Sequence, residues 1–157
     1  MDRTELLTAA HKMLGCALTH LVSDGYVAMA TLLVDENRTM TPISPQTRNV
    51  EERAMFGDVL RQLAPELAGI IIVTEAWALK PASLDEVTTP VSENPKRIEC
   101  VFVSAQSKCG ELTLTQSFHR DADDKPIVAG DLMTAWKDAP NQMTGNFSGL
   151  FAASQSS

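Results

Sequence analysis

Residues 69–79 read GIIIVTEAWAL, an apolar run that carries a single carboxylate in its middle. The run is short and rich in β-branched residues, and it therefore predicts a buried strand. Side chains alternate between the two faces of a strand, so Glu75 shares its face with Val73 and Trp77. A carboxylate in that position indicates either a paired structural group or part of a functional site.

Sequence patterns on both sides of this strand predict two helices and further strands. Apolar residues recur at helical spacing over 4–22, and Asn49 followed by Glu52 forms a capping-box pattern at the start of a second helix. A polar turn at 107–110 separates two apolar runs and predicts a hairpin. The expected elements are helices at 4–22 and 49–63, strands at 26–34, 69–79, 97–105 and 111–120, short edge pieces at 40–44 and 126–128, and a helical turn at 132–137.

The order of these elements predicts an α+β fold. Three consecutive strands follow the second helix, and helices alternate with strands too sparsely for a doubly wound fold. We expect an antiparallel sheet of about four to five strands with two helices packed on one face. The length of 157 residues fits a single domain over 1–157, in which 131–157 forms a partly irregular tail.

Strand pairing predicts a buried polar cluster around Glu75. If 69–79 pairs antiparallel with 97–105, and the turn at 107–110 leads into 111–120, several polar side chains share the face of Glu75. A shift of the register by one residue would reverse this assignment of faces. The candidate cluster consists of Glu75, Trp77, Arg97, Glu99 and Gln116.

This cluster has two interpretations. In the structural one, which we favour, the carboxylate of Glu75 is tied to Gln116, a backbone amide or an arginine, because a buried unpaired charge is costly. In the functional one, Glu75 is a general acid or base beside Trp77, or Arg97 binds a phosphate or carboxylate. The long loop at 81–96 would then be a functional loop beside the site.

Composition and charge narrow the class of protein. The net charge of −7 and the pI near 4.9 disfavour direct nucleic-acid binding, which depends on Lys and Arg. We find no signal peptide and no apolar run near the roughly 20 residues that a membrane-spanning helix needs. Three cysteines without metal-type spacing favour reduced thiols in a cytoplasm, with Cys16 as a small core residue. No catalytic, cofactor or metal motif is found, so we expect no cofactor and no metal.

One part of the chain resembles a known group of proteins. TEAWALKP at 74–81, followed by VSENPKRIECVFVSAQSKCGEL at 91–112, resembles a family of small uncharacterised bacterial and phage α+β proteins. In that family a strand ending in Glu-Ala-Trp precedes a loop that closes in Ser-Glu-x-Pro-x-Arg-x-Glu. The resemblance implies a shared feature and a phage or mobile-element setting, and it implies no reaction. The matching positions are Glu75, Ala76, Trp77, Ser92, Glu93, Pro95, Arg97 and Glu99.

The sequence therefore favours a non-enzymatic binding protein of phage or mobile-element type that acts through protein–protein contacts in the cytoplasm. A homodimer formed through a sheet edge or a polar sheet face is a second hypothesis about partners. The alternative function is a small enzyme or ligand-binding domain with an acid/base or anion site around Glu75 and Arg97. A virion or assembly component is a third hypothesis.

Overall fold

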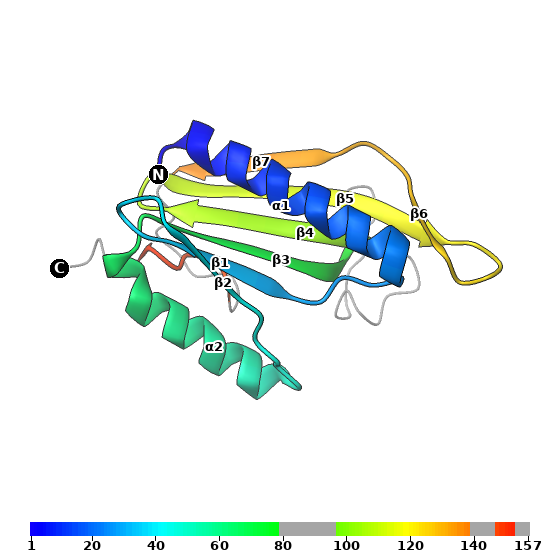
Figure 1. Cartoon of the computed structure of the whole chain (residues 1–157), viewed down its shortest axis with the longest axis horizontal. Coiled ribbons are helices and arrows are strands. Elements are labelled where there is room, and N and C mark those ends of the chain that lie inside the picture. The colour runs from blue at the N-terminus through cyan, green and yellow to red at the C-terminus, as the bar shows by residue number, and fades with distance from the viewer. Residues whose placement is uncertain (79–96, 139–146, 153–157) are drawn as a thin grey trace.

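The computed structural model describes residues 1–78, 97–138 and 147–152, and within them the chain forms two helices and a seven-stranded sheet (Figure 1). The α+β fold class is confirmed. The predicted loop at 81–96 lies outside the described residues. The elements are α1 (Arg3–Asp24), β1 (Ala30–Val34), β2 (Met40–Ile43), α2 (Val50–Leu63), the short 3-10 helix η1 (Ala64–Glu66), β3 (Gly69–Ala78), β4 (Ile98–Ser107), β5 (Gly110–Arg120), β6 (Pro126–Val128) and β7 (Met133–Asp138).

The sheet is antiparallel, with strand order β2-β1-β3-β4-β5-β6, and β7 also pairs with β5. The predicted register around Glu75 is confirmed, because Glu75 lies opposite Val101 and Val101 lies opposite Gln116. Trp77 likewise lies opposite Glu99. The face deduced from the sequence is therefore a real face of the sheet.

Helix α1 begins and ends at clear capping signals. Asp2 and Glu5 form a capping box, in which each side chain accepts a hydrogen bond from the other residue's backbone amide. Gly25 ends the helix in the left-handed conformation, with φ of 85°, which a residue without Cβ adopts at low cost. The buried residues of α1 follow helical spacing and are Leu6, Ala9, Ala10, Leu14, Ala17 and Leu21.

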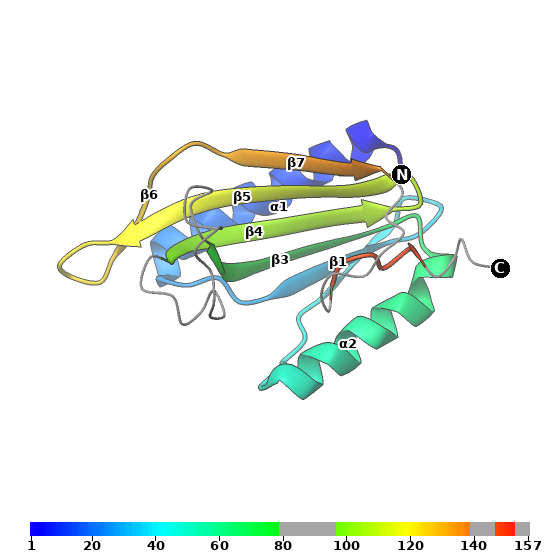
Figure 2. The same cartoon turned by 180° about the vertical axis from the view of Figure 1, so that it is seen from behind.

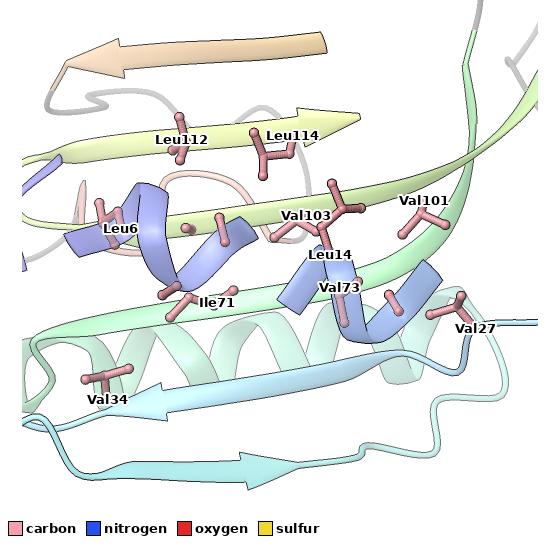
Figure 3. Packing of buried hydrophobic residues seen from close by; sticks show 14 of the residues in the cluster. Leu6, Leu14, Val27, Val34, Ile71, Val73, Val101, Val103, Leu112 and Leu114 are labelled. Carbon is pink, nitrogen blue, oxygen red and sulfur yellow. The ribbon is translucent and has the colours of Figure 1, made fainter. Parts of the chain in front are cut away.

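The main core lies between α1 and one face of the sheet (Figure 3). In Figure 3, Leu6 and Leu14 of α1 point toward side chains of three neighbouring strands, β3, β4 and β5. Burial of this apolar surface is the main favourable contribution to the stability of the described part of the fold. The strand residues labelled in that core are Val34, Ile71, Val73, Val101, Val103, Leu112 and Leu114.

The expectation that both helices pack on one face is wrong. Leu60 and Ala64, at the C-terminal end of α2, pack in a second cluster with Ile70 and Ile72 of β3. Neighbouring side chains of a strand point to opposite faces, and Ile71 belongs to the α1 core. The two helices therefore contact opposite faces, and in Figure 2 the sheet lies in front of α1 while α2 lies below β1.

The expected strand count of four to five is too low, because β6 and β7 both extend the sheet. The predicted strand at 126–128 is confirmed as β6. The predicted helical turn at 132–137 is wrong, since β7 occupies these positions and pairs with residues 110–115 of β5. The segment is too short for periodicity to decide between helix and strand, and the free edge of β5 decides it.

Two further boundaries differ from the sequence expectation. The first strand begins at Ala30 and not at residue 26, because residues 26–29 lie outside the strand ladder. In the expected irregular tail, β7 is regular and Leu150 and Phe151 are fully buried. Over the part of the chain that the structure describes, neither helix is long and apolar enough to cross a membrane.

Candidate functional site

Glu75 is half-buried and lies where β3 extends beyond the end of β1. Strand β1 ends its pairing at Ala30, opposite Val73, so β3 has no β1 partner from Thr74 onward. The amide of Val27 donates to Glu75 Oε1 at 2.6 Å in place of a ladder hydrogen bond. This contact agrees with the structural interpretation, in which Glu75 is tied to a backbone amide.

Trp77 and Arg97 form a contact of their own. The Trp77 side chain is 43% exposed, and the guanidinium carbon of Arg97 lies 4.4 Å from the centre of its ring. That geometry is a cation–π interaction, worth about 0.5–1 kcal/mol at an exposed position. Arg97 therefore stacks on the tryptophan at the end of β3.

Glu99 pairs with an arginine from the next strand. Arg120 Nε lies 3.4 Å from Glu99 Oε2, and both side chains are largely shielded from solvent. Arg120 also donates to the Gly25 carbonyl at 3.0 Å, at the end of α1. This pair ties β4 and β5 to the C-terminus of the helix.

The expected hydrogen bond between Gln116 and Glu75 is wrong. Both residues lie opposite Val101, one on each side of it, and are therefore two strand spacings, about 10 Å, apart. Gln116 is buried, and its Nε2 donates to the Gly130 carbonyl at 3.0 Å. The five residues thus form four separate contacts and not one network.

Glu75 and Trp77 also line an open cleft of about 860 Å³ at this end of the sheet. Arg53 of α2 and Phe147 contribute other parts of its lining. The cleft offers a carboxylate, a guanidinium and an exposed indole, which are binding groups. Among the described residues, no three His, Cys, Asp or Glu side chains converge in a way that could hold a metal ion.

A second hollow, which we call the α1–β1 groove, runs between α1 and the strands β1 and β2. It measures about 360 Å³, and apolar atoms form most of its lining. Helix α1 packs on β3, β4 and β5 (Figure 1). On the same side of the sheet, Ala30 and Leu32 of β1 stay half-buried and Met40 of β2 is exposed, whereas Val34 of β1 is buried in the α1 core. The groove is lined by Met13, Cys16, Ala17, His20 and Asp24 of α1 and by Tyr26, Val27, Ala28, Met29, Ala30, Thr31, Leu32, Pro42, Ser44 and Val73.

Polar groups stand at one end of the α1–β1 groove. His20 Nδ1 lies 3.2 Å from Asp24 Oδ2 near the end of α1. Outside the groove lining, Arg38 of the β1–β2 turn hydrogen-bonds Glu5 at 3.0 Å, which lowers the pKa of the Glu5 carboxyl. Cys16 is exposed on the groove wall, so its interpretation as a core residue is wrong. The buried stripe of α1 passes beside it, through Ala17.

The opposite face of the sheet carries a buried polar network that sequence patterns did not indicate. Glu111 accepts from the hydroxyl of Ser104 at 3.3 Å and from that of Ser148 at 3.2 Å. Gln106 donates to the Ser104 hydroxyl at 2.9 Å and accepts from the Leu150 amide at 2.9 Å. The network holds residues 147–152 against the sheet. Its only sequence signal is the polar character of alternate positions in β4 and β5.

A scan against protein-family models, a search of curated proteins and a search of solved structures each found no match. The resemblance of residues 74–112 to small bacterial and phage proteins therefore stays a prediction.

Proposed function

We propose that the protein is a non-enzymatic binding protein that holds a segment of a partner protein in the α1–β1 groove. One observation carries the proposal: the apolar face of the sheet continues past α1 and stays open to solvent. Ala30 and Leu32 of β1 are only half-buried there. Met40 of β2, on the same face, is 50% exposed.

An apolar hollow of this kind favours a protein segment as its occupant. Covering apolar surface gains about 25 cal/mol per Å², and contiguous exposed apolar patches commonly mark interaction sites. The lining provides few charged groups that could orient a small polar substrate. The resemblance to bacterial and phage proteins supports a cytoplasmic setting of phage or mobile-element type for this binding.

The free edge of β2 is a less favourable surface for a partner or a second copy. Pro42 lies within this four-residue strand and has no amide to donate to an added strand. A homodimer through the sheet edge therefore stays a separate prediction. Measurement of the molar mass in solution over a range of concentrations tests it.

Site-specific photo-crosslinking in the cells that make the protein tests the groove. We expect a photoreactive residue at Cys16 or Ala28 to capture one partner. The same residue at Thr19, which is exposed on α1 outside the groove lining, should not. The purified partner should then bind the Cys16→Trp variant at least about tenfold more weakly, because the indole fills the hollow.

Two results would contradict this function. Capture of the same partner from Thr19 would show that the contact does not depend on the groove. Equal affinity of the purified partner for Cys16→Trp and for Thr19→Trp would show the same, provided that both variants keep the circular dichroism spectrum of the parent.

A second candidate function is the binding of a small ligand in the cleft beside Glu75 and Trp77. The volume of the cleft and the exposed indole favour it. Titration with inorganic phosphate, followed through the amide resonances of Val27 and Trp77, tests its anion-binding form. Shifts that saturate in the parent and are lost in Arg53→Met, which removes the guanidinium of the cleft lining, support that form, whereas identical titrations in both proteins oppose it.

A further inference from the structure

We infer that the occupant of the α1–β1 groove is an amphipathic α-helix of a partner protein, with basic residues flanking its apolar stripe, laid alongside α1. This inference rests on the proposed function and specifies its ligand. The width of the partly open strip, the chemistry of the β2 edge and the acidic charge in and around the groove lead to it.

The partly open strip of sheet is one helix wide. It consists of β2 and the Ala30–Leu32 part of β1, which are neighbouring strands, while Val34 at the end of β1 is already buried. Two strand spacings of roughly 4.8 Å give about 10 Å, which equals the diameter of an α-helix with its side chains. A second helix beside α1 would therefore complete the helix layer on this face without moving any strand.

An extended segment fits the same place less well. Added strands bind through backbone hydrogen bonds to a free edge, and Pro42 removes a donor from β2. A helix satisfies its own backbone and needs only the apolar floor. The α1 side of the groove runs from Met13 to Asp24. At a rise of 1.5 Å per residue, this length matches a helix of about three turns.

The charges in and around the groove favour a basic helix. Asp24 lines the groove and is 54% exposed. Asp35 and Glu36 lie in the β1–β2 turn outside the groove lining, where Asp35 accepts hydrogen bonds from the amides of that turn. The chain as a whole carries a net charge of −7. Lys or Arg residues on both sides of an apolar stripe would match this distribution.

Helix α2 of a second copy does not meet the same requirement. It carries three acidic residues, Glu51, Glu52 and Asp58, and two basic ones, Arg53 and Arg61. Its apolar side is partly used by Leu60, which packs on the sheet. We therefore assign the groove to a helix from another protein.

A model peptide tests the inference. The probe is a fluorescein-labelled 14-residue peptide of Leu and Lys, with Leu at helical spacing on one face. The first control peptide has the same composition with the Leu residues scattered, and the second replaces each Lys by Glu. We expect fluorescence anisotropy to show saturable binding of the probe alone, weakening as the salt concentration rises from about 0.05 to 0.5 M.

Matched variants of the protein locate the bound peptide. Cys16→Trp and Ala28→Trp, inside the groove, should each weaken binding about tenfold or more, and Thr19→Trp should leave it unchanged. Asp24→Asn should weaken binding about two- to fivefold through one lost charge contact. Asp58→Asn, the same charge change on α2 outside the groove, should have no effect.

The outcomes separate this inference from the proposed function. Equal binding of the acidic or scattered peptide, or binding that no groove variant alters, overturns the helix assignment. A partner captured at Cys16 through an extended or acidic segment, or through a second copy of this chain, also overturns it. A heterologous partner captured in the groove by such a segment leaves the proposed function standing.

Discussion

The two faces of the sheet are held in different ways. On the α1 face, apolar side chains from the helix and three strands meet in one continuous core. On the opposite face, the end of α2 packs in an apolar cluster with β3 and Leu150. Beside it, a buried polar network centred on Gln106 and Glu111 holds residues 147–152. Apolar contacts depend on shape and area, whereas polar contacts depend on every donor and acceptor having a partner.

This difference predicts which kinds of substitution should lower the stability of each face. The α1 face should tolerate changes in charge and fail when volume is lost. The opposite face should fail when a hydrogen-bond partner is lost, and also when volume is lost from its apolar cluster. Four tests of this contrast follow, taken from the largest expected effect to the smallest.

The largest effect is expected from Leu6→Ala on the α1 face. Leu6 is fully buried, and its truncation leaves a cavity that costs about 2–5 kcal/mol in the free energy of unfolding. Leu7→Ala is the matched control, because Leu7 is the next residue of the same helix and is 36% exposed. Urea denaturation measures both. Equal losses in the free energy of unfolding for the two variants would contradict the conclusion that α1 buries a single face.

The next effect is expected from Gln106→Leu on the opposite face. The substitution keeps the side-chain volume but leaves the Leu150 amide without its acceptor, at a cost of about 1–3 kcal/mol. We also expect faster proteolysis near 147–152, because the network no longer holds this segment. Gln62→Leu, at an exposed position of α2, is the control. An unchanged free energy of unfolding for Gln106→Leu would break the contrast between the faces.

A smaller effect is expected at Glu75. In Glu75→Ala the Val27 amide loses its acceptor, which should cost about 1 kcal/mol in thermal unfolding experiments. Glu75→Gln keeps a carbonyl oxygen in that place and should remain close to the parent. If Gln proves as damaging as Ala, then the negative charge and not the hydrogen bond is what β3 requires.

The smallest effect is expected at Glu5. The hydrogen bond from Arg38 lowers the pKa of the folded carboxyl below its unfolded value. The contribution of this pair to stability is therefore present above the unfolded pKa and is lost as the pH falls through the folded pKa. Arg38→Met should raise the pKa of Glu5 toward that of a free carboxyl in an NMR titration. An unchanged titration curve would contradict the pairing.

Much of the α1 face could be predicted from the sequence, because its signals are periodic and local. Alternation around Glu75 placed Trp77, Glu99 and Gln116 on one face, and the tight turn at 107–110 set the register. The capping pattern at Asn49 marked the start of α2 correctly. Each of these inferences uses residues that are close in the chain or directly paired.

The rest could not be predicted, because it depends on long-range placement. Gln106 and its partner Leu150 are 44 positions apart, and no pattern in either segment indicates the other. The α1–β1 groove exists because α1 lies over β3, β4 and β5. The apolar stripe of α1 does not determine which strands the helix covers. The predicted polar cluster does not form one network for a simpler reason. Gln116 and Glu75 share a face of the sheet but lie too far apart to touch.

The position of α1 at the start of the chain also has a consequence for biosynthesis. Leu6 leaves the ribosome about 100 residues before Leu112 and Leu114, which cover it. Translation adds about 5–20 residues per second, so the apolar side of the nascent helix stays uncovered for on the order of 5–20 s before β4 and β5 are synthesised. During that interval the helix presents an uncovered apolar surface of the kind that chaperones bind. Ribosome-bound chains halted before β4 should therefore recruit a chaperone, and chains extended past β5 should release it.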